Sequence, residues 1–112
     1  MAVNRKKAFR DDQIAKSLQI ELIAIIESAR DRNINELEII RVQPRPGGKH
    51  FLVFFGPPRD GDQVFTESHD LETVSEHLAR AKGFIRSTLT ETMNLKFAPG
   101  ITFVPDPIQW AK

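Results

Sequence analysis

The chain of 112 residues contains no cysteine, and this absence excludes disulfides, thiolate metal sites and cysteine nucleophiles. It also lacks any apolar run close to the roughly 20 residues that a membrane span requires. The N-terminal stretch MAVNRKKAFRDD has no apolar core of the kind found in a signal peptide. These absences predict a protein of a reducing compartment, and we expect it in the cytoplasm with no membrane partner.

The net charge is only +1, so the total charge does not indicate a polyanionic partner, but the charges are unevenly distributed. The first ten residues carry four cations and no acid, namely Arg5, Lys6, Lys7 and Arg10. The span 59–76 is mainly acidic, and the span 77–96 is basic again. Such a protein can present one basic face to a polyanion, although charge runs are also common on ordinary solvated surfaces. The pattern alone leaves both interpretations open.

At this length we expect one domain, and its first helix is predicted from about Asp11 to Ala29. Apolar residues follow the three-to-four spacing of an amphipathic helix over this stretch, and either Asp11 or Asp12 is predicted as its N-cap. The apolar arc is widened by Ile20, Ile23 and Ile26. Residues 1–9 are predicted to be a flexible basic arm.

Two strands are predicted at residues 37–44 and 50–56, joined by a turn in which Gly47 and Gly48 allow positive φ angles. Alternation predicts that the core-facing side chains are Ile40, Val42, Phe51, Val53 and Phe55. Leu52 and Phe54 fall on the other face. We expect the first helix or the arm to cover them; uncovered, they would form a contact patch.

Residues 56–69 read as a loop, after which Asp70 is predicted to cap a second helical segment. Its apolar stripe consists of Leu71, Val74, Leu78, Ala81, Ile85 and Leu89, and it can extend to Met93. A last strand is predicted within residues 95–107, parallel to a member of the hairpin because a helical crossover precedes it. The sequence therefore predicts an α+β domain in which one layer of helices covers a three-stranded sheet.

Gly83 interrupts the second helical segment, where glycine costs roughly 1 kcal/mol relative to alanine. One interpretation is that the helix is merely bent and Gly83 allows two backbones to pack closely. The other is that Gly83 separates two helices and frees the backbone N–H groups of Phe84 to Arg86 as an anion site. Physical arguments alone favour neither interpretation over the other.

The stretch HLARAKGFIRSTLTETMNLKFAPGITFVPD, residues 77–106, resembles the C-terminal half of the ribosome-binding factor A family. The matching positions are Ala81, Gly83, Phe84, Ile85, Arg86, Leu89, Leu95, Pro99, Ile101, Phe103 and Asp106. The most specific part is the A-x-G break followed by the L-K-x-x-P strand entry. The chain departs from the family pattern at His77, at Gly100 and at Pro107-Ile108, and the stretch RDRNINE lacks the usual Asp-Pro.

The resemblance implies a type II KH-like fold, α-β-β-α-kink-α-β, over residues 10–106, followed by a short tail at 107–112. It implies a factor that associates with the free small (30S) ribosomal subunit and assists late 16S rRNA maturation, with a role in cold adaptation. It implies no enzymatic activity, no catalytic residue, no cofactor and no metal. We expect a monomer.

The predicted RNA-binding residues are those around the A-x-G break and those of the basic N-terminus. They are Arg80, Ala81, Lys82, Gly83 and Arg86, together with Arg5, Lys6, Lys7 and Arg10. Their contacts are expected to be mainly to phosphates, which position a protein on RNA without reading its sequence.

Three other functions compete with this one. An enzyme would have to use His50, His69 or His77, but their spacing matches no metal-ligand or acid–base pattern. A KH-like module for protein–protein contact, without RNA binding, would use Leu52 and Phe54, whereas Trp110 is expected to pack back on the domain. A KH domain acting on other RNA is disfavoured, because the chain lacks a G-x-x-G loop.

Overall fold

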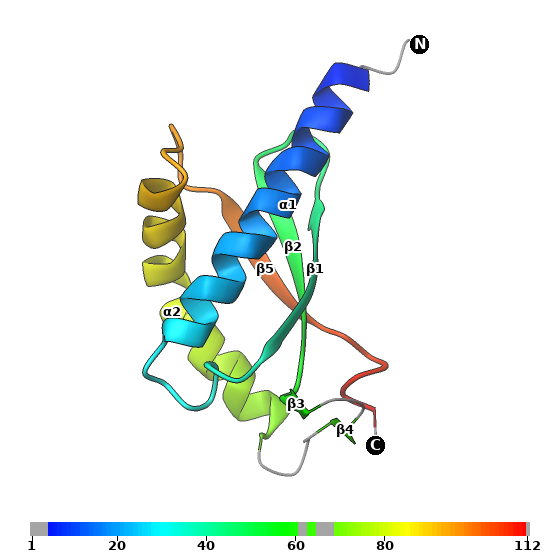
Figure 1. The fold of residues 1–112 in the computed structure, drawn as a ribbon, viewed down its shortest axis with the longest axis vertical. Helices are drawn as coiled ribbons and strands as arrows, with labels where there is room; N and C mark the ends of the chain where they lie inside the picture. Colours follow the sequence, from blue (N-terminus) through cyan, green and yellow to red (C-terminus); the bar gives the residue numbers. More distant parts are fainter. Residues whose placement is uncertain (1–4, 61–62, 65–68, 112) are drawn as a thin grey trace.

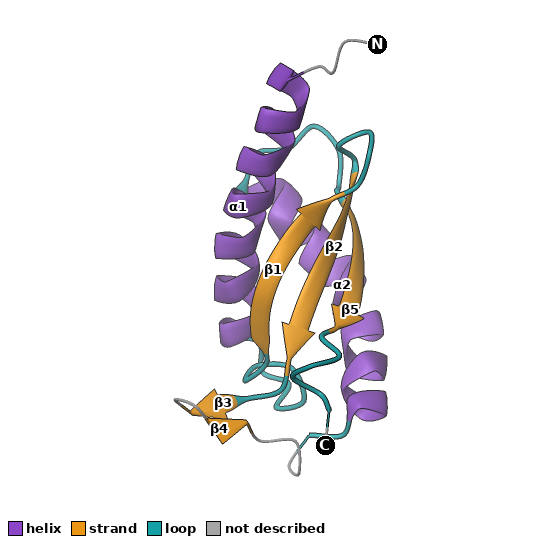
Figure 2. Ribbon diagram, turned by 90° about the vertical axis from the view of Figure 1, so that its right-hand side faces the viewer, coloured by secondary structure: helices purple, strands orange, loops and turns teal. Residues whose placement is uncertain are grey.

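The computed structural model describes residues 5–60, 63–64 and 69–111. The main elements in chain order are α1 (Arg5–Ser28), β1 (Glu38–Pro44), β2 (His50–Gly56), α2 (Leu71–Thr92) and β5 (Gly100–Pro105). Both helices pack on the same face of the sheet formed by β1, β2 and β5 (Figures 1 and 2). The predicted α+β, KH-like arrangement with helices on one face is thus confirmed.

The β1–β2 hairpin forms as predicted, because Gly47 and Gly48 take φ angles of 100° and 68° at its turn. A β-bulge changes the expected core pattern in β1, where Ile39 pairs with Phe55 but Arg41 pairs with Phe54. Ile39 is therefore buried and Ile40 only half-buried, so the prediction of Ile40 as a core residue is wrong. The Ile40 carbonyl accepts a hydrogen bond of 3.2 Å from Gln19 of α1.

Strand β5 lies parallel to β2, as the helical crossover predicts, with Phe51 opposite Ile101 and Val53 opposite Phe103. The core is formed by the inner face of this sheet and the apolar stripes of both helices. Its most completely buried large side chains include Phe51, Phe55, Leu18, Leu22, Ile26, Leu78, Ile85, Leu89 and Ile101. Burying side chains of this size contributes about 1.5–3 kcal/mol each.

The outer face of the sheet is not covered by either helix (Figure 2). Leu52 and Phe54 lie on this face and are half-buried, so the prediction that α1 covers them is wrong. The guanidinium carbon of Arg41 lies 4.1 Å from the centre of the Phe54 ring and shields part of it. The outer face of the sheet is therefore a surface that a partner could contact.

Helix α1 begins at Arg5, so residues 5–9 extend the helix instead of forming a flexible arm. Residues 1–4 of the predicted arm lie outside the described residues. The extension follows from the Arg, Lys and Ala residues there, which are strong helix formers, with no proline or glycine to stop the helix. Asp11 and Asp12 consequently lie within α1 and do not cap it. Ile20 is 68% exposed and does not widen the buried face as expected.

Neither α1 nor α2 is both long enough and apolar enough to span a membrane, on a search of the described residues.

The segment between β2 and α2 was predicted as a loop but contains a short hairpin, β3 (Arg59–Asp60) with β4 (Gln63–Val64). The Asp60-Gly61 pair is a sequence signal for a tight turn. Residues 61–62 and 65–68 of the predicted loop lie outside the described residues. At the other end of the chain, Trp110 packs back on the domain as predicted. Its indole N–H donates to the Phe55 carbonyl at 3.1 Å, and the two rings meet edge to face.

Both ends of α2 have local signals that fix where it begins and ends. Asp70 is the N-cap, and its carboxylate accepts hydrogen bonds of 3.0 Å from the backbone N–H and the hydroxyl of Thr73. Asn94 follows the helix with a φ of 51°, and the Leu95 N–H donates to the Thr90 carbonyl at 2.9 Å. This Schellman-type ending turns the chain toward β5.

We expect Asp70→Ala to lower the free energy of unfolding by about 1 kcal/mol, because the first turn of α2 loses its cap. Asp12→Ala is the matched control, since Asp12 is exposed within α1, and it should change stability by less than about 0.5 kcal/mol. Urea unfolding followed by circular dichroism measures both. A larger loss for Asp12→Ala than for Asp70→Ala would contradict this assignment of the helix ends.

Candidate nucleic-acid interface

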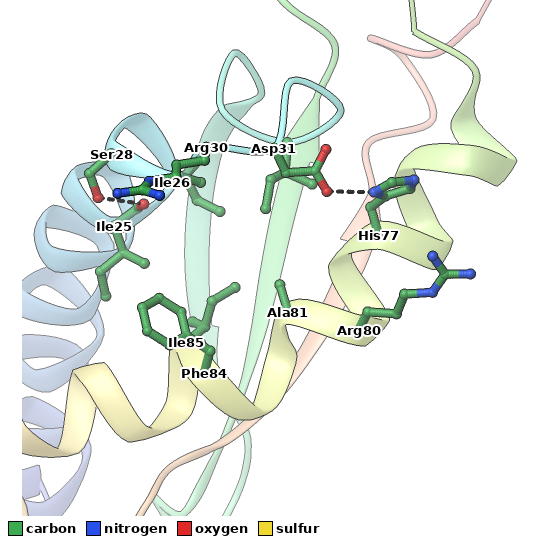
Figure 3. A pocket seen from close by; sticks show the side chains of 12 residues that line it. Ile25, Ile26, Ser28, Arg30, Asp31, His77, Arg80, Ala81, Phe84 and Ile85 are labelled. Carbon is green, nitrogen blue, oxygen red and sulfur yellow. Dashed lines mark hydrogen bonds and ion pairs between the residues drawn. The ribbon is translucent and has the colours of Figure 1, made fainter.

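Helix α2 is continuous from Leu71 to Thr92, but its ribbon changes direction at its middle (Figure 1). The close view places Ala81 and Phe84 on either side of this bend (Figure 3). The predicted kink is therefore a bend within one helix. The alternative of two separate helices is wrong, and no helix N-terminus lies at Phe84 to Arg86 to supply free amides for an anion.

Gly83 has no steric role within the chain. A Cβ atom at this position would meet nothing within 4 Å, apart from the helix itself, and the residue is exposed. Its φ angle is not in the left-handed region, so the conformation does not require glycine either. The interpretation that Gly83 allows close packing of two backbones in the domain is thus excluded. The glycine leaves a smooth, open patch on the solvent side of α2.

Two guanidinium groups flank this patch, because Arg80 and Arg86 stand three residues before and three residues after Gly83 on the helix. Arg80 is exposed, whereas Arg86 is half-buried and its Nε donates a hydrogen bond of 2.8 Å to the Pro99 carbonyl. That bond ties α2 to the segment entering β5 and orients the arginine. We call the row of Arg80, Gly83 and Arg86 the glycine row.

Lys82 and Ala81 lie on other sides of the helix. Lys82 is half-buried and lines a shallow pocket beside Phe103 of β5. Ala81 points inward, where it packs against the core and lines a groove between α2 and α1. Of the five residues predicted around the A-x-G break, three therefore form the glycine row, Lys82 lies beside it, and Ala81 faces the interior.

The basic residues near the N-terminus lie far from the glycine row. The N-terminal turns of α1 form one end of the long axis of the molecule, and they project beyond the sheet (Figure 1). Arg10 is exposed there, and the side chains of Arg5, Lys6 and Lys7 lie outside the described part of the structure. The fold does not bring the two predicted groups of cations together.

A groove of about 650 Å³ lies beside the glycine row, between the C-terminal end of α1 and the middle of α2 (Figure 3). Its floor is apolar and consists of Ile25, Ile26, Ala29, Ile34, Ala81 and Ile85. Phe84 forms one wall, although 70% of its surface is exposed, and Arg30 lies at the rim. Sequence reasoning placed neither of these side chains at a binding surface. The available signal was that Phe84 falls outside the apolar stripe of its own helix.

His77 and Asp31 close one end of the groove, where His77 Nδ1 lies 2.5 Å from the Asp31 carboxylate. The backbone N–H of Asn33 donates to the same carboxylate at 2.9 Å and holds the pKa of Asp31 below its usual range. Partial burial opposes this shift in pKa, and the contact with His77 acts in the same direction as Asn33. These contacts fix the turn after α1 against α2.

The three histidines that an enzyme could use are each engaged in a different contact. His69 Nε2 lies 3.0 Å from the Arg32 carbonyl, and His50 Nε2 lies 2.7 Å from the Thr102 hydroxyl. In the described parts of the chain, no three histidine, aspartate or glutamate side chains are grouped as a metal site requires. His69 and His77 both hold the turn after α1.

The order of elements, the mixed three-stranded sheet and the bent α2 define an α+β domain of the predicted KH-like class. The crystal structure of ribosome-binding factor A from Thermus thermophilus superposes with a TM-score of 0.57 at 19% sequence identity, covering 89% of this chain and 91% of that one. At this identity the likeness demonstrates the fold alone.

The sequence comparisons identify the family. The family model described as Ribosome-binding factor A matches residues 10–109. Two relatives carry that name, one from Dechloromonas aromatica with 29% identity and one from Hyphomonas neptunium with 27% identity. The alignments cover 91% and 90% of this chain, and 78% and 72% of the respective relatives. The chain belongs to the ribosome-binding factor A family.

Because Gly83 lies exposed in a helical conformation, Gly83→Ala is expected to raise the free energy of unfolding by about 0.5–1 kcal/mol. Ser87→Ala, at an exposed position one turn further along α2, is the control for helix propensity alone. Its gain in the free energy of unfolding should be smaller than that of Gly83→Ala. Urea unfolding measures both variants. A loss of stability in Gly83→Ala would show that the domain itself requires glycine at the bend.

The pKa of Asp31 is lowered in the folded protein. The ionised carboxylate is therefore expected to stabilise the fold at pH values above its usual pKa, near 4. This contribution is lost as the pH falls through the lower pKa of the folded state. Asp31→Asn should therefore be less stable than the parent by a constant amount above about pH 5. The difference should shrink as the pH is lowered below about 4. Urea midpoints at several pH values measure this difference, and a gap that persists unchanged at about pH 2.5 would contradict it.

Proposed function

We propose that this protein binds the free small ribosomal subunit and assists late maturation of its rRNA. Membership in the ribosome-binding factor A family supports an association with the ribosome, since the relatives and the structural neighbour carry that name. The proposal is specific to the 30S particle and to 16S rRNA because the family resemblance implies that stage of assembly. Binding, and no covalent step by this chain, is the activity proposed.

The glycine row is the proposed principal contact with rRNA, and exposed Gly83 is the observation on which this rests. A helix interior that keeps glycine without any internal steric reason tolerates a local cost of roughly 1 kcal/mol. That cost is understandable where another backbone must come close to the helix, because a side chain would hold it away. Arg80 and Arg86 on the two sides of Gly83 would then neutralise neighbouring phosphates.

Lys82 and Ala81 have supporting roles in this proposal. Lys82 adds positive charge at the β5 side of the row, within reach of the same phosphate chain. Ala81 packs against the core on the inner side of α2, so it makes no direct contact with RNA in this proposal. The predicted contact set around the A-x-G break therefore contains residues that would face RNA and one residue, Ala81, that faces the core.

The basic N-terminal turns of α1 would form a second, electrostatic contact. Arg5, Lys6, Lys7 and Arg10 lie on the first turns of α1, at the far end of the molecule from the glycine row. Two charged regions separated along a domain 47 Å long can engage two rRNA segments at once. The protein would then hold those segments in one relative arrangement, so that binding favours the correctly folded subunit by mass action.

The second candidate function is a protein–protein module without RNA binding. It is favoured by the uncovered outer face of the sheet, where Leu52 and Phe54 are half-buried and no helix packs on them. A contact made through this face would depend on apolar burial and would change little with ionic strength. A contact made through phosphates would weaken steeply as salt is raised.

The double variant Arg80→Glu, Lys82→Glu is expected to weaken binding to purified free small subunits by at least about tenfold, since attraction to phosphate becomes repulsion. Arg86 is left intact because its bond to Pro99 also supports the fold. Lys16→Glu, an exposed charge reversal on α1, is the matched control and should retain binding. Co-sedimentation measures all three proteins.

The same assay repeated over a salt series separates the two candidate functions. Parent protein that binds through several phosphates should show a linear fall of log affinity with log salt concentration. Unchanged co-sedimentation of the double variant, together with a flat salt response, would refute the RNA contact. That result would favour the sheet face instead.

A further inference from the structure

The groove beside the glycine row has an unusual combination of features for a surface that only the solvent contacts. Its floor is aliphatic, and Phe84, which forms one wall, leaves 70% of its surface exposed. Figure 3 shows the Phe84 ring on α2 facing the end of α1 across the groove. Burying such a ring against a ligand would be favourable, and nothing in the described chain covers it.

Cationic side chains lie on both sides of this groove. Arg30 comes from the end of α1 and extends toward Ser28, whereas Arg80 comes from α2 and points away on the opposite side (Figure 3). Among the described residues, neither guanidinium has an ion pair or hydrogen bond with another side chain. Arg30 thus stands at one rim of the apolar groove, and the Arg80 side chain leaves the opposite rim with its guanidinium directed outward.

We propose that the groove receives one unpaired base of the RNA strand that runs along the glycine row, with the base stacked on Phe84. This inference rests on the proposed function, because Arg80 belongs both to the row and to the rim of the groove. It adds a feature that phosphate contacts alone do not supply: a requirement for an unpaired nucleotide at that place. The occupant is defined by chemistry, as a planar base with a phosphate on each side.

The charge arrangement favours a nucleotide over a protein segment. Within an RNA strand, a base is flanked by its own 5′ phosphate and by the phosphate of the next residue. Arg30 at one rim and the exposed Arg80 side chain, turned toward the strand from the other rim, would match these two phosphates. An apolar peptide segment would also fill the floor, but it would need acidic residues at both flanks to match Arg30 and Arg80. The aromatic ring supplies the sequence-tolerant stacking that single-stranded RNA commonly uses.

The polar side chains at the Asp31–His77 end of the groove are not available to bind the base. The Asp31 carboxylate already accepts hydrogen bonds from the backbone and side-chain amides of Asn33, and it also contacts His77. These contacts occupy the Asp31 carboxylate oxygens and hold this end of the groove in place. The anionic carboxylate also makes that end a poor place for a phosphate, so the phosphates are expected at the two arginine flanks.

The first test compares Phe84→Leu with Phe84→Tyr in binding to purified free small subunits. Phe84→Leu keeps apolar volume but removes the ring, and it should weaken binding by about 5- to 150-fold, the range typical of one stacked base. Phe84→Tyr keeps the ring and should restore most of the affinity. Phe97→Leu is the matched control, because Phe97 is 71% exposed but lies in the loop before β5, and it should bind like the parent.

The second test identifies what occupies the groove. A benzophenone-bearing phenylalanine analogue is placed at position 84, with position 97 as control, and the protein is irradiated on purified small subunits. Cross-linking from position 84 to a nucleotide that is unpaired in the subunit supports the inference. Cross-linking to a ribosomal protein or to a paired nucleotide, or no cross-link above the control, overturns it.

The outcomes separate this inference from the function on which it rests. Should Phe84→Leu bind like the parent while the Arg80→Glu, Lys82→Glu variant does not, the glycine row stands and the base-binding groove is refuted. Should both variants bind like the parent, the proposed RNA contact itself fails. An equal loss for Phe84→Leu and Phe84→Tyr would show that stacking is not the interaction.

Discussion

The parallel pairing of β5 with β2 determines where α2 must lie and which of its sides is buried. Antiparallel strands can be joined by a tight turn, but a parallel partner needs a crossover, and α2 is that crossover. Its inner stripe of Val74, Leu78, Ile85 and Leu89 is buried against the sheet and α1. Once that stripe is fixed, the opposite side of the helix, which carries Gly83, must face the solvent.

A second contact set places the end of α1 beside the bend of α2. His69 lies just before α2 and His77 in its second turn, and both reach the turn that follows α1, at the Arg32 carbonyl and the Asp31 carboxylate. The groove exists because this turn is held in place. Histidines that could be taken for catalytic groups therefore hold the turn after α1 in place.

Gly83 departs from a local rule of helix stability, and the proposed RNA contact would give that departure a reason. The sequence around it favours a helix, and α2 forms without interruption, although glycine is a poor residue for that position. Natural proteins tend to break such rules at functional positions. Here the stripe on the inner side supplies enough burial to keep the helix intact, so its outer surface is free to be adapted to a partner.

The sequence predicts correctly the features that depend on neighbouring residues, namely the hairpin around Gly47-Gly48, the Asp70 cap and the stripe of α2, and it carries the family resemblance. It did not determine where α1 begins, because Asp12 is a good cap only if the preceding residues are not helical. The bulge at Ile40 and the groove beside Phe84 arise only when the helices and strands pack together. The reason is physical, since the groove is held by a contact between Asp31 and His77, 46 positions apart, and no local periodicity encodes such a distance.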